Sequence, residues 1–359
     1  MRALFFIQFK IALYYLVHMV CLRWAIGFLG CVLCMACTQG NRAKTPAVAW
    51  YWWKTVYSPD ATELAYFKNC GSKRLAVHLF DVDSSVLLGV PAPKAVLKQL
   101  QSLPDSFNWV PVVYITRASL LNPGNLDSLA SHIANLVNGL CKGKAWTEIQ
   151  WDHDWTGTTR SNYFSLLRIL KKLPVFQQKQ FTATIRLHQL QQVQPELIPP
   201  VDKGLLMLYN MGNLTRFESK NSIYEEETLA QYAKFLKPYP LSLDWALPVF
   251  AWGVQFRQGR FVAIMNGLRS DGIAQSGMAD TLPDGRFRCR KAGYLNGFPV
   301  QAGDIIRTEA CKVRDLKKIV RTLNAECEKV ADYVYFFDWQ KQHLPYFSPY
   351  DIQQIAQTH

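Results

Sequence analysis

The sequence of 359 residues alternates between short apolar strands and amphipathic helices, and this alternation restricts the fold more than any other feature. Strand-like runs are expected at residues 47–53, 75–80, 110–116, 146–155, 181–187, 204–209, 241–247 and 333–337. Runs with helical spacing follow most of them, at residues 61–69, 93–102, 125–140, 160–173, 225–236 and 349–356. About eight such units in one chain predict an α/β fold, the (β/α)8 or TIM barrel.

A doubly wound open sheet is the competing architecture. Such a sheet usually carries a glycine-rich phosphate-binding turn after an early strand, and the sequence has none there. Between the seventh and eighth strands lies a long segment, residues 250–331, with short strand-like runs and turns before a helix at 313–330. We expect it to be a small α+β insertion in a barrel domain that spans residues 47–359.

The first 37 residues contain two apolar runs, three lysine or arginine residues and no acidic residue. The second run, residues 24–36, has the length of the apolar core of a signal peptide and is short for a membrane span. It ends in Ala36-Cys37, and a polar tether at residues 38–46 follows. The pattern resembles a bacterial lipoprotein signal. It predicts a signal peptide at residues 1–37, lipidation of Cys37, and an envelope protein anchored to a membrane, at the outer membrane or facing the periplasm.

Three alternatives for the leader stay open. Cys31 is a second candidate for lipidation, and Met19 is a second candidate for the start of translation. Both apolar runs together would also suit one uncleaved anchor helix, although Arg23 divides them.

The net charge of +13 is spread along the chain and forms no nucleic-acid-binding motif. We therefore expect no nucleic-acid partner, and the charge is compatible with acidic glycans or anionic envelope surfaces. The cysteines after the leader are scattered, so we expect no metal site, and we expect no cofactor. In an exported protein Cys289 and Cys311 would be able to form a disulfide, which the sequence alone does not decide.

The fourth predicted strand has one polar and one apolar face. Along it, Glu148, Gln150, Asp152 and Asp154 alternate with Ile149, Trp151, His153 and Trp155. A glycine and a helix-forming run follow at once, so the apolar face should pack on helices and the carboxylate face should look into the barrel. Asp152 and Asp154 are then at the carboxyl end of the strand, where TIM-barrel enzymes carry their catalytic groups.

Further polar and aromatic side chains are expected on the same rim. They are Trp53 from the first strand, Asp81 from the second, Arg186 and His188 from the fifth, Tyr209 and Asn210 from the sixth, and Asp244 from the seventh. Carboxylates can exchange protons, aromatic rings stack on sugar faces, and arginine or asparagine can hold hydroxyl groups. The rim therefore predicts a site for a glycan or oligosaccharide.

Two of these motifs resemble the chitinase-like family 18 glycoside hydrolases. In that family the fourth strand ends in Asp-x-Asp-x-Glu and the sixth carries Met-x-Tyr-Asp. Here the matching stretches are Gln150-Trp151-Asp152-His153-Asp154 and Met207-Leu208-Tyr209-Asn210. The likeness covers most of the chain after the leader, and it is closer to a bacterial side branch than to true chitinases. It implies Asp154 as general acid, Asp152 as the partner that sets its pKa, and Tyr209 beside the anomeric centre.

Two departures from the family pattern bear on the function. Asp154 is one methylene shorter than glutamate, and Asn210 replaces an acid that orients the substrate's acetamido group. The expected function is a glycoside hydrolase-like envelope lipoprotein that acts on a glycan by carboxylate acid–base catalysis. The alternative is a non-catalytic glycan-binding barrel, in which Asp154 is held ionised against Arg186. A purely structural pairing of the barrel acids with Arg186, and a structural His188, are the plainer interpretations.

Overall fold

The computed structural model describes residues 45–85 and 87–358. The predicted signal peptide, Cys37 and nearly all of the predicted tether lie outside the described residues. From Thr45 onward the chain forms one compact unit. Among the helices of this described part, none combines the length and the apolar character needed to cross a bilayer.

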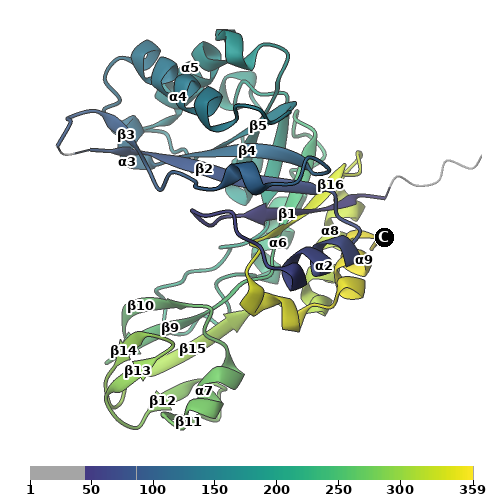
Figure 1. The fold of residues 1–359 in the computed structure, drawn as a ribbon. Helices are drawn as coiled ribbons and strands as arrows, with labels where there is room; N and C mark the ends of the chain where they lie inside the picture. The colour runs from purple at the N-terminus through teal and green to yellow at the C-terminus, as the bar shows by residue number, and fades with distance from the viewer. Residues whose placement is uncertain (1–44, 86, 359) are drawn as a thin grey trace, which may run out of the picture. The chain divides into compact units, whose positions relative to one another are not determined.

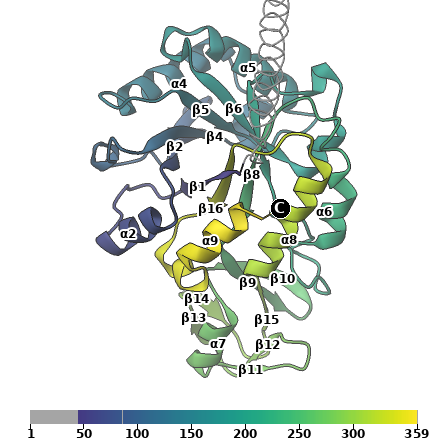
Figure 2. The same cartoon turned by 90° about the vertical axis from the view of Figure 1, so that its right-hand side faces the viewer.

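Eight parallel strands close into a barrel (Figure 1, Figure 2). They are β1 (Ala47–Trp52), β2 (Arg74–Ser84), β4 (Asn108–Ile115), β5 (Glu148–Asp152), β6 (Gln180–Arg186), β7 (Lys203–Met207), β8 (Leu243–Pro248) and β16 (Tyr333–Phe337). Each strand pairs with the next in this order, and β1 pairs with both β2 and β16, which closes the ring. The predicted TIM barrel is confirmed.

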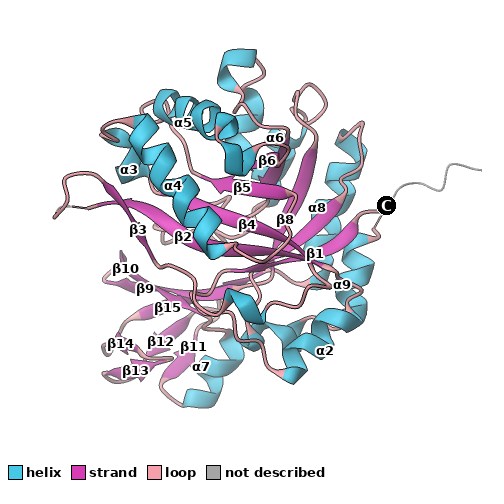
Figure 3. Cartoon of the chain, turned by 45° about the horizontal axis from the view of Figure 1, so that its top comes forward, coloured by secondary structure: helices cyan, strands magenta, loops and turns pink. Residues whose placement is uncertain are grey.

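Helices cover the outside of the barrel, as the cyan and magenta elements of Figure 3 show. They are α2 (Ala61–Asn69), α3 (Arg117–Leu121), α4 (Leu126–Leu140), α5 (Arg160–Lys172), α6 (Glu226–Ala233), α8 (Val313–Glu326) and α9 (Pro349–Ala356). Short 3-10 turns complete the connections: η1 (Leu100–Ser102), η2 (Pro174–Phe176), η3 (Leu187–Gln191), η4 (Pro195–Leu197) and η5 (Lys341–Tyr346). Their ends follow the sequence: Asp60 caps α2 through the backbone N–H of Glu63, and Ser348 caps α9 just before Pro349.

The barrel strands alternate between an inner and an outer layer of side chains. Small and aromatic residues such as Ala49, Tyr51, Ala246 and Tyr335 form the inner cluster. The opposite phase packs under the helices, where Trp151 is fully buried. The two faces predicted for the fourth strand are therefore present in β5.

The helix expected at residues 93–102 is absent, so this prediction is wrong. In its place β2 continues to Ser84 and turns back as β3 (Pro91–Lys94), which pairs antiparallel with it. Ala95 and Gln99 then have φ values of 49° and 63°, which a right-handed helix cannot contain. The second strand therefore carries a β-hairpin at the carboxyl end of the barrel.

A separate small sheet lies between β8 and α8. It contains β9 (Ala251–Arg257), β10 (Arg260–Asn266), β11 (Ala279–Thr281), β12 (Phe287–Cys289) and β15 (Ile305–Ala310), with α7 (Ser270–Ser276) and the hairpin β13 (Gly293–Leu295) and β14 (Phe298–Val300). It has its own apolar cluster, which includes Met265, Phe287 and Ile306. Cys289 and Cys311 are both buried free thiols, so the bridge considered from the sequence is not formed.

Candidate active site

Asp152 is the last residue of β5, and its carboxylate faces the inside of the barrel at the carboxyl end. Its Oδ1 accepts a hydrogen bond from the Thr184 hydroxyl on β6, with 2.7 Å between the oxygens. The pKa of Asp152 is raised to about 7, chiefly by burial and in part by the charges of Asp154 and Asp81. The Thr184 hydrogen bond and the Arg186 charge oppose this rise. Asp152 therefore holds a proton up to near-neutral pH.

Asp154 lies two residues further along and is bound by an arginine. Its Oδ2 accepts from Arg186 Nη1 at 2.9 Å, and the two side chains are 44% and 32% exposed. Its Oδ1 is buried without a hydrogen-bond partner among the described residues. Arg186 is the last residue of β6. It binds Asp154 directly and acts on Asp152 through its charge, so the predicted placement of Arg186 with the two aspartates is observed.

Tyr209 follows β7 and forms one wall of the site. Its ring stacks on Phe337, with 5.2 Å between centroids and 20° between planes, and meets the edge of Phe250. Burial holds the pKa of Tyr209 well above its usual range, and the charges of Asp152 and Asp154 raise it further. The phenol therefore keeps its proton and can donate it in a hydrogen bond. The next residue, Asn210, is exposed and has a φ of 57°.

Gln150 sits one inward position before Asp152. It is buried, and its Oε1 accepts a hydrogen bond from the Tyr51 hydroxyl on β1. Gln150 occupies the position of the first aspartate in the family motif. A neutral amide that binds Tyr51 therefore stands where the family has a carboxyl group. A direct contact of Gln150 with substrate, expected from the sequence, stays a prediction.

The opposite wall comes from the first strands. Trp53 follows β1, and its ring centroid lies 4.6 Å from that of His78 and 5.5 Å from that of Phe337. Asp81 of β2 is partly exposed and binds His78 Nε2 at 2.7 Å. Trp53 and Asp81 therefore lie near the carboxyl end, where the sequence placed them, although no described contact tests whether they bind substrate.

His188 and Asp244 differ from the sequence predictions. β6 ends at Arg186, and His188 lies in η3, where it is exposed. It therefore does not continue the row of inward-facing side chains of β6. The residue as a whole is exposed, but partial loss of water around the ring and the charge of Arg186 lower the pKa of His188.

Asp244 was expected on the rim, and that placement is wrong. It is the second residue of β8 and thus lies at the amino end of the barrel, 4% exposed. Its Oδ1 binds Lys203 Nζ at 2.8 Å and accepts the backbone N–H groups of Asp332 and Tyr333. The predicted strand began at residue 241, whereas β8 begins at Leu243. Asp244 therefore lies near the start of its strand, at the amino end of the barrel.

Several site residues were missed from the sequence. Tyr114 on β4 has its pKa raised to about 12 by burial and by the charges of Asp152 and Asp154. Phe337 ends β16 and lies against the rings of Tyr51, Trp53 and Tyr209. Asp338 follows it across a cis peptide bond and is buried. An aromatic residue near the carboxyl end of a predicted strand was the available signal for both, since Phe337 ends β16 and Tyr114 is the residue before the end of β4.

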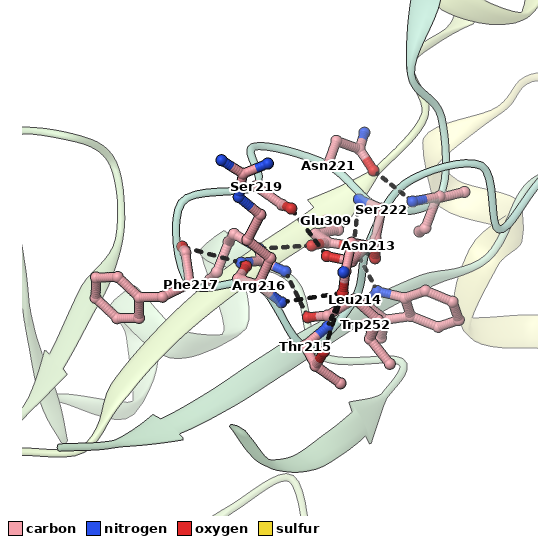
Figure 4. Close-up of polar contacts among 12 residues, drawn as sticks. Asn213, Leu214, Thr215, Arg216, Phe217, Ser219, Asn221, Ser222, Trp252 and Glu309 are labelled. Carbon is pink, nitrogen blue, oxygen red and sulfur yellow. Dashed lines mark hydrogen bonds and ion pairs between the residues drawn. The ribbon is translucent and has the colours of Figure 1, made fainter. Parts of the chain in front are cut away.

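The loop after Asn210 is held by the inserted sheet, as Figure 4 shows. Arg307 on β15 donates to the carbonyl oxygens of Leu214, Arg216 and Phe217 and binds Glu309 Oε1 at 2.6 Å. The other carboxylate oxygen of Glu309 accepts from the backbone N–H and hydroxyl of Ser222 and from Trp252 Nε1.

The loop also closes on itself, because the N–H groups of Met211 and Gly212 donate to the carbonyl oxygens of Ile223 and Ser222. Residues 211–223 therefore form one closed loop whose position beside Tyr209 depends on the Arg307–Glu309 pair. Both side chains of that pair are buried.

Within residues 45–85 and 87–358, no group of three or more His, Cys, Asp or Glu side chains is placed to hold a metal ion. The chemistry that the site offers is acid–base chemistry. Asp152 retains a proton near neutrality while Asp154 is paired with a cation, and such a difference in environment separates the roles of two carboxyl groups.

Solved structures with the same barrel were found by comparison of folds. A family 18 chitinase from Flavobacterium johnsoniae matches with a TM-score of 0.52 and 12% identity, over 88% of this chain and 94% of that one. The chain has the fold of the family 18 chitinases. A chitinase from Bacteroides thetaiotaomicron matches with a TM-score of 0.56 and 10% identity, over 88% of this chain and 97% of that one. The spore cortex-lytic enzyme of Bacillus cereus matches with a TM-score of 0.54 and 12% identity, over 88% of this chain and 75% of that one.

The likeness to family 18 barrels that was first drawn from the β5 and β7 motifs is confirmed at the level of the fold. Identities of 10 to 12% fit a distant branch. No protein-family model and no curated protein sequence matches the chain.

Proposed function

We propose that the carboxyl end of the barrel binds a glycan and hydrolyses a glycosidic bond with Asp152 and Asp154 as its acid–base pair. The observation that carries this proposal is the raised pKa of Asp152, about 7, beside a second carboxylate that pairs with Arg186. A carboxyl group that stays protonated near neutral pH next to an ionised one is the arrangement that glycosidases use.

In the proposed reaction Asp154 delivers the proton, because its side chain is 44% exposed and can reach a ligand. Ligand binding competes with Arg186 for Asp154, and the proton of Asp152 passes to Asp154. Asp154 then gives it to the glycosidic oxygen as the bond from that oxygen to the anomeric carbon breaks. Water supplies the hydroxyl group to the anomeric carbon and returns a proton to the pair. Tyr209 donates a hydrogen bond at the reacting centre, and Trp53 and Tyr114 contact the sugar faces.

A non-catalytic glycan-binding barrel is the second candidate, and the Asp154–Arg186 ion pair favours it. If the pair persists when a glycan is bound, Asp154 stays ionised and has no proton to deliver. The aromatic walls and the polar rim would still hold the sugar. The two candidates therefore differ in one property, the protonation of Asp154 in the complex.

A hydrolysis assay of the full chain in detergent separates the two candidates. The probes are a chromogenic chitobioside and a chito-oligosaccharide, which suit the activity named for the structural relatives. Turnover that is lost in Asp154→Asn and kept in the exposed control His132→Gln supports the hydrolase. Binding without turnover supports the binding barrel. Neither binding nor turnover on these probes or on a wider glycan array overturns both.

We also propose that the protein is an envelope lipoprotein anchored through Cys37. The support is the Ala36-Cys37 sequence after an apolar run of signal-peptide length, followed by a polar tether. An export signal would be consistent with a glycan of the cell envelope as the substrate.

A further inference from the structure

The buried His78 and the partly exposed Asp81 form a pair beside the site, and a β-bulge in β2 makes the pair possible. In the pairing of β2 with β4, His78 faces Val112 and Phe80 faces Val113, so Leu79 is an extra residue. Arg74, Ala76 and His78 point into the barrel in the regular alternation. After the bulge the phase shifts, because Leu79 and Phe80 both pack in the outer core.

Without the bulge Asp81 would face the helices. Positions three apart on a regular strand point to opposite sides of a sheet. The extra residue turns Asp81 inward, onto the same side as His78, and bulges often redirect a side chain in this way next to active sites. A charged aspartate in the outer apolar layer would be strongly destabilising, so the bulge and the pair belong together.

The geometry of the pair determines which ring nitrogen carries the proton. His78 is 3% exposed, its Nε2 lies 2.7 Å from Asp81 Oδ1, and its Nδ1 is buried with no hydrogen-bond partner among the described residues. Burial lowers the pKa of His78, so the ring is neutral at pH 7 and the single N–H is the one on Nε2. The Trp53 ring, 4.6 Å away, covers the imidazole.

The pair reaches the acid–base centre through Asp81. The Asp81 carboxylate is 27% exposed, and only its Oδ1 is used by His78. Its charge acts on Asp152 and on Tyr114. Two other charged groups act on Asp152, namely Asp154 and Arg186, and the Thr184 hydroxyl donates a hydrogen bond to it. Three neutral phenols also interact with Asp152: those of Tyr51, Tyr163 and Tyr209.

We propose that His78 is a positioning residue for the hydrolase reaction: held under the Trp53 ring, it fixes the Asp81 carboxylate, so that Asp81 contacts the bound sugar and adds its negative charge to the environment of Asp152. This inference rests on the proposed function. It assigns a role to His78, which makes no contact with the two reacting carboxyl groups.

The first experiment needs no ligand and no turnover. NMR of the full chain in detergent micelles follows the ¹⁵N shifts of the His78 ring and the ¹³C shift of the Asp152 carboxyl through a pH titration. The neutral Nε2–H tautomer is expected in the wild type. In Asp81→Asn and in His78→Phe the midpoint of Asp152 is expected to fall by about half a unit or more. His78→Gln keeps an N–H donor near Asp81 and is expected to keep the wild-type midpoint.

The second experiment measures binding of chitohexaose by calorimetry. His78→Phe is expected to weaken binding about tenfold, and His78→Gln by less than about threefold, with His132→Gln as the exposed control. Circular dichroism and thermal unfolding check that each variant is folded. If His78→Phe is folded and matches the wild type in both the Asp152 midpoint and the affinity, the proposal is wrong.

A probe that fails to bind even to the wild type would count against the proposed function, and the NMR titration would still decide the role of His78. An Nδ1–H tautomer, or an Asp152 midpoint that is unchanged in Asp81→Asn, would overturn the inference by itself.

Discussion

Asp154 Oδ2 and Arg186 Nη1 lie 2.9 Å apart at the mouth of the barrel, and both side chains remain partly exposed. Ion pairs in such surroundings contribute about 0.2 to 1 kcal/mol, because water screens the charges. A sugar hydroxyl group can replace the guanidinium at small cost in free energy. The pair therefore fixes the position of the Asp154 side chain in the free protein without preventing its release when a ligand enters.

Asp154→Asn is expected to reduce hydrolysis of a chromogenic chitobioside by about 10²- to 10⁴-fold, the usual contribution of a general acid. Binding of a chito-oligosaccharide should change little, since asparagine has nearly the same shape. Steady-state kinetics and calorimetry measure the two effects. The matched control is Asp105→Asn, which removes a carboxylate that is 89% exposed and is not part of this site. Turnover at the wild-type rate in Asp154→Asn would remove the enzyme assignment.

Asp152→Asn is expected to make the protein more stable at alkaline pH. The pKa of Asp152 is raised to about 7 in the folded protein, against about 3.9 in an unfolded chain. Between these values the folded state binds the extra proton, so the wild type loses stability as the pH rises. The variant has no such loss.

Urea unfolding at pH 4 and pH 8 measures the difference. The variant should match the wild type at pH 4 and exceed it at pH 8 by on the order of 4 kcal/mol, which follows from a pKa of about 7 in the folded protein against about 3.9 in the unfolded chain. A gain of equal size at both pH values would mean that packing, and not ionisation of Asp152, causes it.

Arg186→Met is expected to raise the pKa of Asp152, because the Arg186 charge lowers it in the wild type. The free energy of unfolding should fall by no more than about 1 kcal/mol, since the ion pair with Asp154 is partly exposed. This is a smaller effect than a fully buried pair would give. A carboxyl ¹³C titration and urea unfolding give the two quantities, and a lower Asp152 midpoint would contradict the structure.

Glu309→Gln is expected to destabilise the protein by about 3 kcal/mol, because it leaves the buried Arg307 cation without its counter-charge. Limited proteolysis should then cut within residues 211–223, which the pair holds. Asp280→Asn breaks the exposed pair with Arg290 in the same inserted sheet and is the control, with a change near zero. Equal effects of the two substitutions would show that burial of the Glu309 pair is not what matters.

Cys37→Ser is expected to abolish lipidation and membrane association. Mass spectrometry of the mature protein and membrane fractionation test it. A full-length variant that stays firmly in the membrane fraction would mean that the apolar runs form a retained anchor helix.

The alternation of strand and helix was enough to predict the barrel, and the two-residue period of β5 and β6 placed Asp152 and Arg186 on one side. The same period fails on β2, where one extra residue changes which side chains point inward, and nothing in the local sequence marks Leu79 as that residue. It also misplaced Asp244, because strand starts are set by pairing with neighbouring strands.

The remaining misses are contacts between distant parts of the chain. Tyr209 stacks on Phe337, and Arg307 binds the carbonyl groups of the loop after Asn210. Spacing within one strand carries no information on such partners. The types of side chain were enough to predict the chemistry of the rim, whereas the partners of each side chain depend on the tertiary structure.

The order of synthesis gives the Arg307 contacts a further consequence. Arg307 lies 90 to 93 residues after the carbonyl groups that it binds, and the stacking partner of Tyr209 is on the last barrel strand. A chain emerging from the ribosome makes the loop long before it makes the groups that fix it. A polypeptide that stops before β16 has neither a closed ring nor Phe337, the ring against which both Tyr209 and Trp53 pack. Premature termination therefore yields a fragment without the site, in place of a shortened but active protein.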